Sequence, residues 1–119
     1  MIPMILYMSS RKYTVEEVLN FCKNNIVVIV DRIDGKNRAF QESVAITYEE
    51  MIQEIRTLRK ELLYKGPFLD RDRPGNYLYE FHKLVKNKWC YIKLTIDDKR
   101  TVVVRVISFH ESEGVAYAW

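Results

Sequence analysis

The chain, residues 1–119, predicts one α+β domain in which two to three helices pack on one face of a small antiparallel sheet. Capped helical segments in the first half and alternating strands in the second half are the observations that predict it. A length of 119 residues fits a single domain, and 48% hydrophobic with 29% charged residues is typical of a globular protein. Residues 1–10 lack the basic start and clear cleavage site of a signal peptide, and are interpreted as an added strand or a flexible start.

The first helix is predicted within YTVEEVLNFCKNN, residues 13–25. Thr14 and Glu17 have the spacing of a capping box, and apolar residues then recur at helical spacing. The β-branched run IVVIV, residues 26–30, predicts a buried strand. Residues 36–46 are ambiguous, and we assign them to a short helix.

A second, longer helix is predicted from another capping box, formed by Thr47 and Glu50. Its apolar stripe contains Met51, Ile55, Leu58 and Leu62. Its basic residues, on a solvated face, are Arg56, Arg59 and Lys60. We end this helix near Tyr64, because glycine and proline follow. The next segment, KGPFLDRDRPGN at residues 65–76, is then a long loop, and such loops in compact domains are often functional.

Three strands joined by short turns are predicted at residues 77–85, 89–96 and 101–109. Each alternates in the way typical of a strand with one face in a core. The segments KNK and DDKR are the turns between them. The three strands are therefore expected to form an antiparallel meander.

The register of the first hairpin follows from its turn. Asparagine favours the centre of a two-residue turn, so we place Asn87 and Lys88 there. Val85 then lies opposite Cys90, and both face the core. Lys83 falls on the same core face, and either extends to an edge of the sheet or indicates that the register is off by one.

The other face of the predicted sheet carries an unusual set of side chains. The set is Glu80, His82, Tyr91, Lys93 and Arg105. Its cations suit the neutralisation of phosphoryl oxygens, and its phenol, imidazole and carboxylate suit proton transfer, so the set fits metal-free chemistry on a phosphodiester. A solvent-exposed face with cross-strand charge pairs is the alternative interpretation.

Charge and cysteine usage bear on partners and compartment. The net charge is +3, but residues 63–105 carry ten basic and five acidic side chains, which fits a polyanionic partner or a solvated basic surface. Cys22 and Cys90 are far apart in the chain, and we interpret them as buried thiols in a reducing, cytoplasmic compartment. No apolar run approaches ~18 residues, so no membrane helix is expected.

Three segments, in order, resemble the MqsR-type toxins of bacterial toxin–antitoxin pairs. They are YKGPFLDRDRPG at 64–75, YEF at 79–81 with YIKL at 91–94, and ISFHESE at 107–113. The resemblance covers roughly residues 12–113. It implies a RelE-like fold, a messenger-RNA endoribonuclease activity, and a cognate antitoxin protein that keeps the activity silent. We expect neither a metal nor a cofactor.

The resemblance also implies site residues. The family's catalytic lysine after the long helix and its tyrosine in the Y-x-K strand match Lys65 and Tyr91. Lys93 and His110 complete the expected catalytic set, and His110 stands where the family sometimes has a lysine. The residues expected to bind RNA are Arg105, His82, Glu80, Arg71 and Arg73. Alternatively, Arg71 and Arg73 form ion pairs with the neighbouring aspartates in the loop. A glutamine that family members can carry has no counterpart, and Leu78 or Glu80 occupies that neighbourhood.

In the expected reaction the 2′-hydroxyl of RNA attacks the adjacent phosphate, which Lys65, Lys93 and Arg105 hold. Tyr91 and His110 share the proton transfers, with His82 in reserve. An unperturbed phenol has a pKa of about 10, so Lys93 must favour the ionised form of Tyr91 if this residue is to act as a base. A non-catalytic RNA-binding module and a protein-interaction module remain alternatives.

Overall fold

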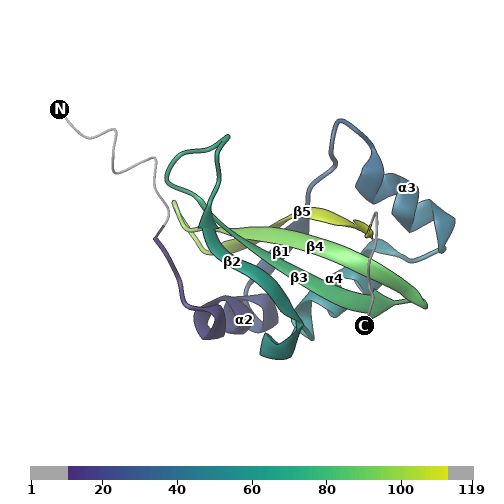
Figure 1. Ribbon diagram of the computed structural model, residues 1–119, viewed down its shortest axis with the longest axis horizontal. Helices are drawn as coiled ribbons and strands as arrows, with labels where there is room; N and C mark the ends of the chain where they lie inside the picture. Colours follow the sequence, from purple (N-terminus) through teal and green to yellow (C-terminus); the bar gives the residue numbers. More distant parts are fainter. Residues whose placement is uncertain (1–10, 113–119) are drawn as a thin grey trace.

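The computed structural model describes residues 11–112, which form an α+β fold of three helices and a five-stranded mixed sheet (Figure 1). The helices are α2 (Val15–Asn24), α3 (Lys36–Ser43) and α4 (Tyr48–Arg56), with a 3₁₀ turn η1 (Lys60–Leu62). The strands are β1 (Ile26–Ile29), β2 (Leu63–Leu69), β3 (Tyr77–Val85), β4 (Lys88–Asp97) and β5 (Val103–Glu111). The predicted α+β class is confirmed. The interpretation of residues 1–10 lies outside the described residues.

The strands are ordered β1-β5-β4-β3-β2 across the sheet. Strands β3, β4 and β5 are antiparallel neighbours, which confirms the predicted meander. Strand β1 is parallel to β5, with Ile26 opposite Val103. The predicted antiparallel sheet is therefore corrected at this edge. A parallel neighbour is possible here because a long connection with helices separates the two strands in the chain.

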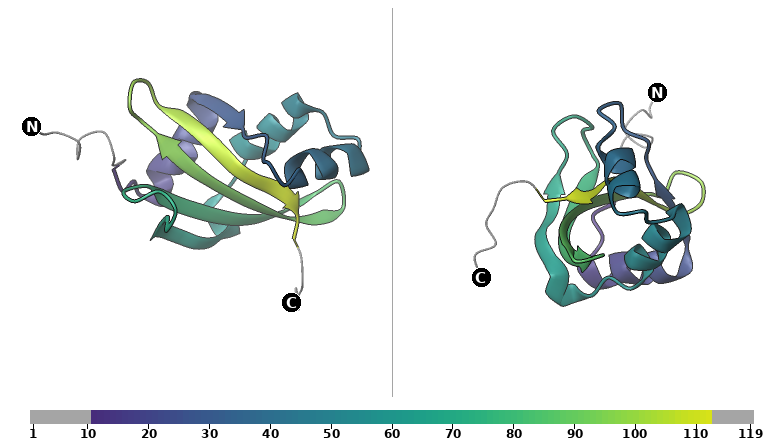
Figure 2. Two further views of the ribbon diagram at one scale, coloured as in Figure 1. Left: turned by 90° about the horizontal axis from the view of Figure 1, so that it is seen from above. Right: turned by 90° about the vertical axis from the view of Figure 1, so that its right-hand side faces the viewer.

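Helices α2 and α4 lie on one side of the sheet (Figure 2). Both begin at the predicted capping boxes, with Thr14 and Thr47 as N-caps. Their apolar stripes and the inward residues of the sheet form one core. Its fully buried members include Val18, Cys22, Met51, Ile55, Phe81, Ile92, Leu94, Val104 and Val106. We call the opposite face of the sheet, which neither of these two helices covers, the outer face.

Both cysteines are buried free thiols, as predicted. Burial raises the pKa of Cys22 and of Cys90 to about 12, so both thiols stay protonated at neutral pH. None of the helices that the structure describes is long and apolar enough to cross a membrane.

The long helix predicted to reach Tyr64 ends at Arg56. The Thr57 hydroxyl donates to the carbonyl oxygen of Gln53 (2.9 Å) just past this end. The chain then forms η1 and strand β2, which pairs with β3. The first part of the predicted loop at 65–76, residues 65–69, is therefore strand. The proline of β2 is compatible with pairing because β2 is an edge strand, where one N–H can be missing.

Strand β1 is an edge strand, whereas its composition predicts a buried one. Val27 is its one buried residue, and Ile26 is 56% exposed. A short apolar run does not distinguish an edge position from a central one, because both place one side of the strand against a core.

The β3–β4 turn is centred on Lys86 and Asn87, both with positive φ, and not on Asn87 and Lys88 as predicted. The pairing moves by two residues, so that Tyr79 lies opposite Leu94. A shift of two leaves every side chain on its predicted face, because strand side chains alternate with a period of two.

Lys83 lies on the helix side of the sheet, as the predicted faces require. Its ammonium group donates to the Glu54 carbonyl oxygen (2.9 Å) and pairs with the Glu54 carboxylate (2.8 Å). It also donates to the Thr57 hydroxyl (2.7 Å). These partners lie at the C-terminal end of α4, where a cation is favourable. The position of Lys83 on the helix side is therefore explained without a one-residue shift of the register.

Strand β5 contains a β-bulge. Val106 lies opposite Leu94, but Ser108 lies opposite the preceding residue, Lys93. Ile107 is thus an extra residue in β5. The bulge exchanges the inward and outward positions in the second half of this strand.

The exchange moves His110 to the outer face. Arg105 faces outward before the bulge, and His110 faces outward after it, opposite Tyr91. Phe109 is fully buried and stacks with Phe40 of α3, with ring centroids 5.9 Å apart. Without the bulge, every second residue after Val104 and Val106 would face the core, and His110 would be one of them.

Asn37 of α3 is buried and holds the bulge in place. Its NH₂ group donates to the carbonyl oxygens of Val30 (2.9 Å) and Ile107 (3.0 Å). Its Oδ1 accepts from the N–H of Phe109 (2.8 Å). One side chain therefore pairs backbone groups that the bulge removes from the regular ladder.

Arg56 does not lie on a solvated face, which corrects the prediction. Its guanidinium donates to the carbonyl oxygens of Cys22 (3.0 Å) and Asn25 (2.9 Å) at the end of α2. It thus pairs carbonyl groups that a helix end leaves without helical partners. Lys60 forms an exposed ion pair with Glu16, as expected of a surface residue.

We expect Arg56→Ala to lower the free energy of unfolding by about 1–2 kcal/mol, because partly buried carbonyl groups lose a charged donor. Lys60→Ala is the matched control and should change stability little, since its ion pair is exposed. Urea denaturation of both variants measures the difference. Equal midpoints for the two variants would contradict the capping role of Arg56.

Candidate functional site

Side chains on the outer face lie in rows that cross the strands. Successive rows on one face are about 7 Å apart along a strand. Two neighbouring rows contain most of the predicted site residues. The aromatic row is Tyr64, His82, Tyr91 and His110. The charged row is Lys65, Glu80, Lys93 and Ser108.

The rings of the aromatic row neighbour one another across four strands. Tyr64 stacks on His82, with centroids 4.4 Å apart and ring planes 13° apart. The Tyr91 ring centroid is 5.9 Å from those of His82 and His110. Trp89 lies edge-on to His82 at 6.0 Å. The structure thus brings the predicted residues His82, Tyr91 and His110 together. It adds Tyr64, which the sequence predicts at the end of a helix and not in the sheet.

The charged row places a glutamate between two lysine residues of the neighbouring strands. Lys65 and Lys93 lie opposite Glu80 on its two neighbouring strands. Glu80 is only 9% exposed. Within residues 11–112, neither lysine forms an ion pair, and the Lys65 ammonium lies over the Phe68 ring at 4.3 Å from its centroid. Both cations are therefore available to a bound anion.

Tyr91 and Glu80 link the two rows. The Tyr91 hydroxyl donates to Oε2 of Glu80 at 2.5 Å. Burial, and after it this hydrogen bond and the Glu80 charge, raises the pKa of Tyr91 above its usual value. The condition for Tyr91 to act as a base, that Lys93 favours the ionised phenol, is not met: the cation that lowers the pKa of Tyr91 is Arg32, and its effect is smaller than the rise. Tyr91 keeps its proton at neutral pH, and Glu80 is the group placed to accept one.

Arg32, in the segment between β1 and α3, is a site residue that sequence reasoning missed. Its Nη1 donates to the Ser108 hydroxyl (2.6 Å), and its Nη2 pairs with Asp34 (2.6 Å). The parallel pairing of β1 with β5 brings this segment to the charged row. In the sequence it is one more arginine beside an Asp-Gly turn, and only the strand order reveals it.

Lys65 is positioned by an irregular part of β2. Register shifts lie on both sides of its pairing with Glu80. Gly66 has φ +124°, and a Cβ there would lie 2.6 Å from the carbonyl oxygen of Leu78. Glycine therefore allows β2 to approach β3 closely beside Lys65.

The two histidines have different settings. Burial lowers the pKa of His82, and the opposing effect of Glu80 is smaller. His82 is therefore neutral at pH 7 and brings no positive charge to a phosphate. Nδ1 of His110 lies 3.1 Å from the carbonyl oxygen of Glu111. A proton on Nδ1 leaves Nε2 as the acceptor in the neutral ring.

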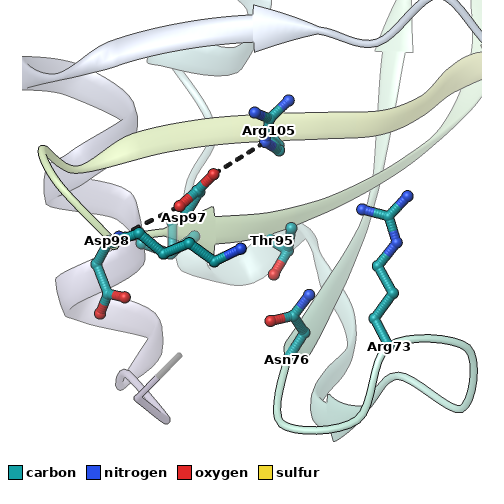
Figure 3. A pocket seen from close by; sticks show the side chains of 8 residues that line it. Arg73, Asn76, Thr95, Asp97, Asp98 and Arg105 are labelled. Carbon is teal, nitrogen blue, oxygen red and sulfur yellow. Dashed lines mark hydrogen bonds and ion pairs between the residues drawn. The ribbon is translucent and has the colours of Figure 1, made fainter. Parts of the chain in front are cut away.

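Arg105 lies in the next row of the outer face, opposite Thr95. Its Nε pairs with Asp97 at 3.2 Å. It lines a pocket of about 60 Å³. Arg73 also lines this pocket and extends toward the strands from the loop after β2 (Figure 3). The structure thus brings Arg73 and Arg105 to one pocket, but sets them apart from Tyr91.

The loop arginines do not pair with the neighbouring aspartates in the part of the chain that the structure describes. Asp70 instead accepts the backbone N–H of Asp72 (2.9 Å). Arg71 and Arg73 are exposed. The ion-pair interpretation is therefore wrong, and RNA contact by these two residues stays a prediction.

Among residues 11–112, no cluster of three or more His, Cys, Asp or Glu side chains is placed to hold a metal ion. The chain matches no model of a known protein family, and a search of curated proteins finds no match.

Proposed function

We propose that this chain is a small endoribonuclease of RelE-like fold, similar to the MqsR-type toxins, which cuts messenger RNA without a metal ion. The observation that carries the proposal is the hydrogen-bonded pair of Tyr91 and Glu80, with Lys65 and Lys93 on the strands beside Glu80. A proton donor, a proton acceptor and two cations within one short stretch of sheet are the groups that phosphodiester cleavage requires.

In the proposed reaction, Glu80 takes the proton of the RNA 2′-hydroxyl, and the 2′-oxygen forms a bond to phosphorus. The bond from phosphorus to the 5′-oxygen breaks, and Tyr91 gives its proton to this leaving oxygen. The products are a 2′,3′-cyclic phosphate and a 5′-hydroxyl. Because Tyr91 and Glu80 share a hydrogen bond, the proton on Glu80 returns directly to Tyr91.

Three cations stabilise the charge on the phosphoryl oxygens: Lys65, Lys93 and Arg32. Arg32 takes the role first given to Arg105, because it reaches the charged row through its bond to Ser108. Arg105 lies in the next row, opposite Thr95, and so lies farther from Tyr91 and Glu80. His110, whose ring lies beside that of Tyr91, shares the proton transfers as expected from the sequence.

A cognate antitoxin protein and a cytoplasmic site of action belong to the same proposal. The resemblance of YKGPFLDRDRPG, YIKL and ISFHESE to MqsR-type toxins supports this part. A non-catalytic RNA-binding module with the same outer face, or a protein-interaction module, is the alternative.

The purified chain is expected to cut single-stranded RNA in the presence of a chelator and to leave 2′,3′-cyclic phosphate ends. A 2′-deoxy nucleotide before the cut should prevent cleavage there, because the nucleophile is absent. Gel electrophoresis and mass spectrometry of the products measure both results. Cleavage that requires added magnesium, or that continues at the 2′-deoxy position, would overturn the mechanism. RNA binding without cleavage would support the non-catalytic module.

The same assay tests the cations. Lys65→Ala and Lys93→Ala should each slow cleavage by on the order of a hundredfold, as expected for groups that stabilise developing charge. Lys23→Ala, an exposed lysine in the last turn of α2, is the control and should keep the rate.

A further inference from the structure

A pocket of about 280 Å³ lies at the β2 end of the aromatic row, beside the groups used in the proposed reaction. Its lining residues are Glu61, Leu62, Leu63, Tyr64, His82 and Trp89. We propose that this pocket binds one nucleobase of single-stranded RNA, stacked on the Tyr64 ring. The inference rests on the proposed function and adds to it the position of a base next to the reacting phosphate.

The lining favours a nucleobase over a phosphate. Among the residues that the structure describes, no lysine or arginine lines the pocket, and the acid that lines it, Glu61, would repel an anion. His82 is neutral at pH 7, because burial lowers its pKa. An uncharged aromatic ring fits apolar walls and ring faces, whereas a phosphate needs positive charge or backbone N–H donors.

The Tyr64 ring is prepared for stacking. Its residue is 64% exposed, which is high for an aromatic side chain in a strand. One face of the ring lies against His82 at 4.4 Å, nearly parallel, so its orientation is fixed before a ligand arrives. A rigid ring loses little conformational freedom when a base binds it.

The pocket lies at the right place relative to the charged row. Tyr64 precedes Lys65 in β2, and His82 lies two residues after Glu80 in β3. Neighbouring rows are about 7 Å apart, which is the scale of the separation between the base and the phosphate of one nucleotide. A base in the pocket therefore places its own or the adjoining phosphate at Lys65.

The test is the affinity of the full chain for 2′-O-methyl oligoribonucleotides, which lack the reactive hydroxyl, with each base in turn replaced by an abasic site. For the unmodified chain, one abasic position should weaken binding roughly tenfold, the scale of one base–aromatic stack. In Tyr64→Ala this loss should disappear, and in Tyr64→Phe it should remain. Leu69→Ala is the control, because Leu69 is 58% exposed on the same strand.

The outcomes separate this inference from the proposed function. The proposal that this pocket binds a base is overturned if no abasic position matters more than the others, or if Tyr64→Ala keeps the tenfold loss. RNA cleavage by the protein without substitutions would still support the proposed function. If the unmodified chain binds no oligonucleotide and cuts no RNA, the proposed function is overturned with it. Circular dichroism of Tyr64→Ala checks its fold, which an exposed side chain should not disturb.

Discussion

Glu80→Gln is expected to slow RNA cleavage by about a thousandfold and to leave RNA binding nearly unchanged, as is typical for loss of a positioned base. Glutamine has the size of glutamate, and its carbonyl oxygen still accepts the hydrogen bond of Tyr91, but it cannot take a proton from the 2′-hydroxyl. Single-turnover cleavage rates, measured beside the affinity for uncleavable 2′-O-methyl RNA, separate the two effects. Glu49→Gln, at an exposed position in the first turn of α4, is the control and should keep the rate.

The same experiment tests whether Glu80 and Tyr91 act as a unit. Tyr91→Phe should also slow cleavage, by on the order of a hundredfold, because the leaving oxygen loses its proton donor. The double variant should be about as slow as the slower single variant, since groups that act together are not additive. A wild-type rate for Glu80→Gln would show that another group is the base, and multiplied losses in the double variant would show that the two residues act separately.

Asn37→Ala is expected to have the largest effect on stability, on the order of 3 kcal/mol, which corresponds to a fall of roughly 10 °C in Tm. The substitution leaves the Ile107 carbonyl and the Phe109 N–H without the partners that they have in the structure. A buried backbone group without a partner costs more than the bond itself contributes. Thermal and urea denaturation measure the loss.

Asn24→Ala is the matched control, because Asn24 is exposed and its side chain donates to Asn20, one turn earlier in α2. Its Tm should change little. A Tm for Asn37→Ala close to that of Asn24→Ala would mean that the bulge holds its shape without the asparagine.

The features of the fold that local patterns determine could be predicted from the sequence. The capping boxes at Thr14 and Thr47 determine where α2 and α4 begin, and alternation identifies three strands. The segment at 63–69 could not be assigned, because its leucines continue a helical stripe and only pairing with β3 makes it a strand. The partner of β1 depends on the packing of the whole chain, and no local pattern contains it.

In the candidate site too, the features set by local patterns could be predicted, and those set by the packing of distant segments could not. Glu80, Tyr91 and Lys93 were placed on one face correctly even though the hairpin register was wrong by two, because an even shift preserves faces. Arg32 was missed, since it reaches the site only through the parallel strand. The protonation state of Tyr91 was missed as well, because burial and the Glu80 hydrogen bond, not sequence proximity to Lys93, set its pKa.

The position of β5 between β1 and β4 has a consequence for how the protein is made. During synthesis, β1 leaves the ribosome early, but its neighbour in the sheet is the last described strand to emerge. Contacts between segments so distant in the chain form late and slow the folding of a domain. Arg32, Ser108 and His110 therefore meet only after β5 is complete. If the proposed function holds, a nascent chain would have no assembled catalytic face until β5 has left the ribosome.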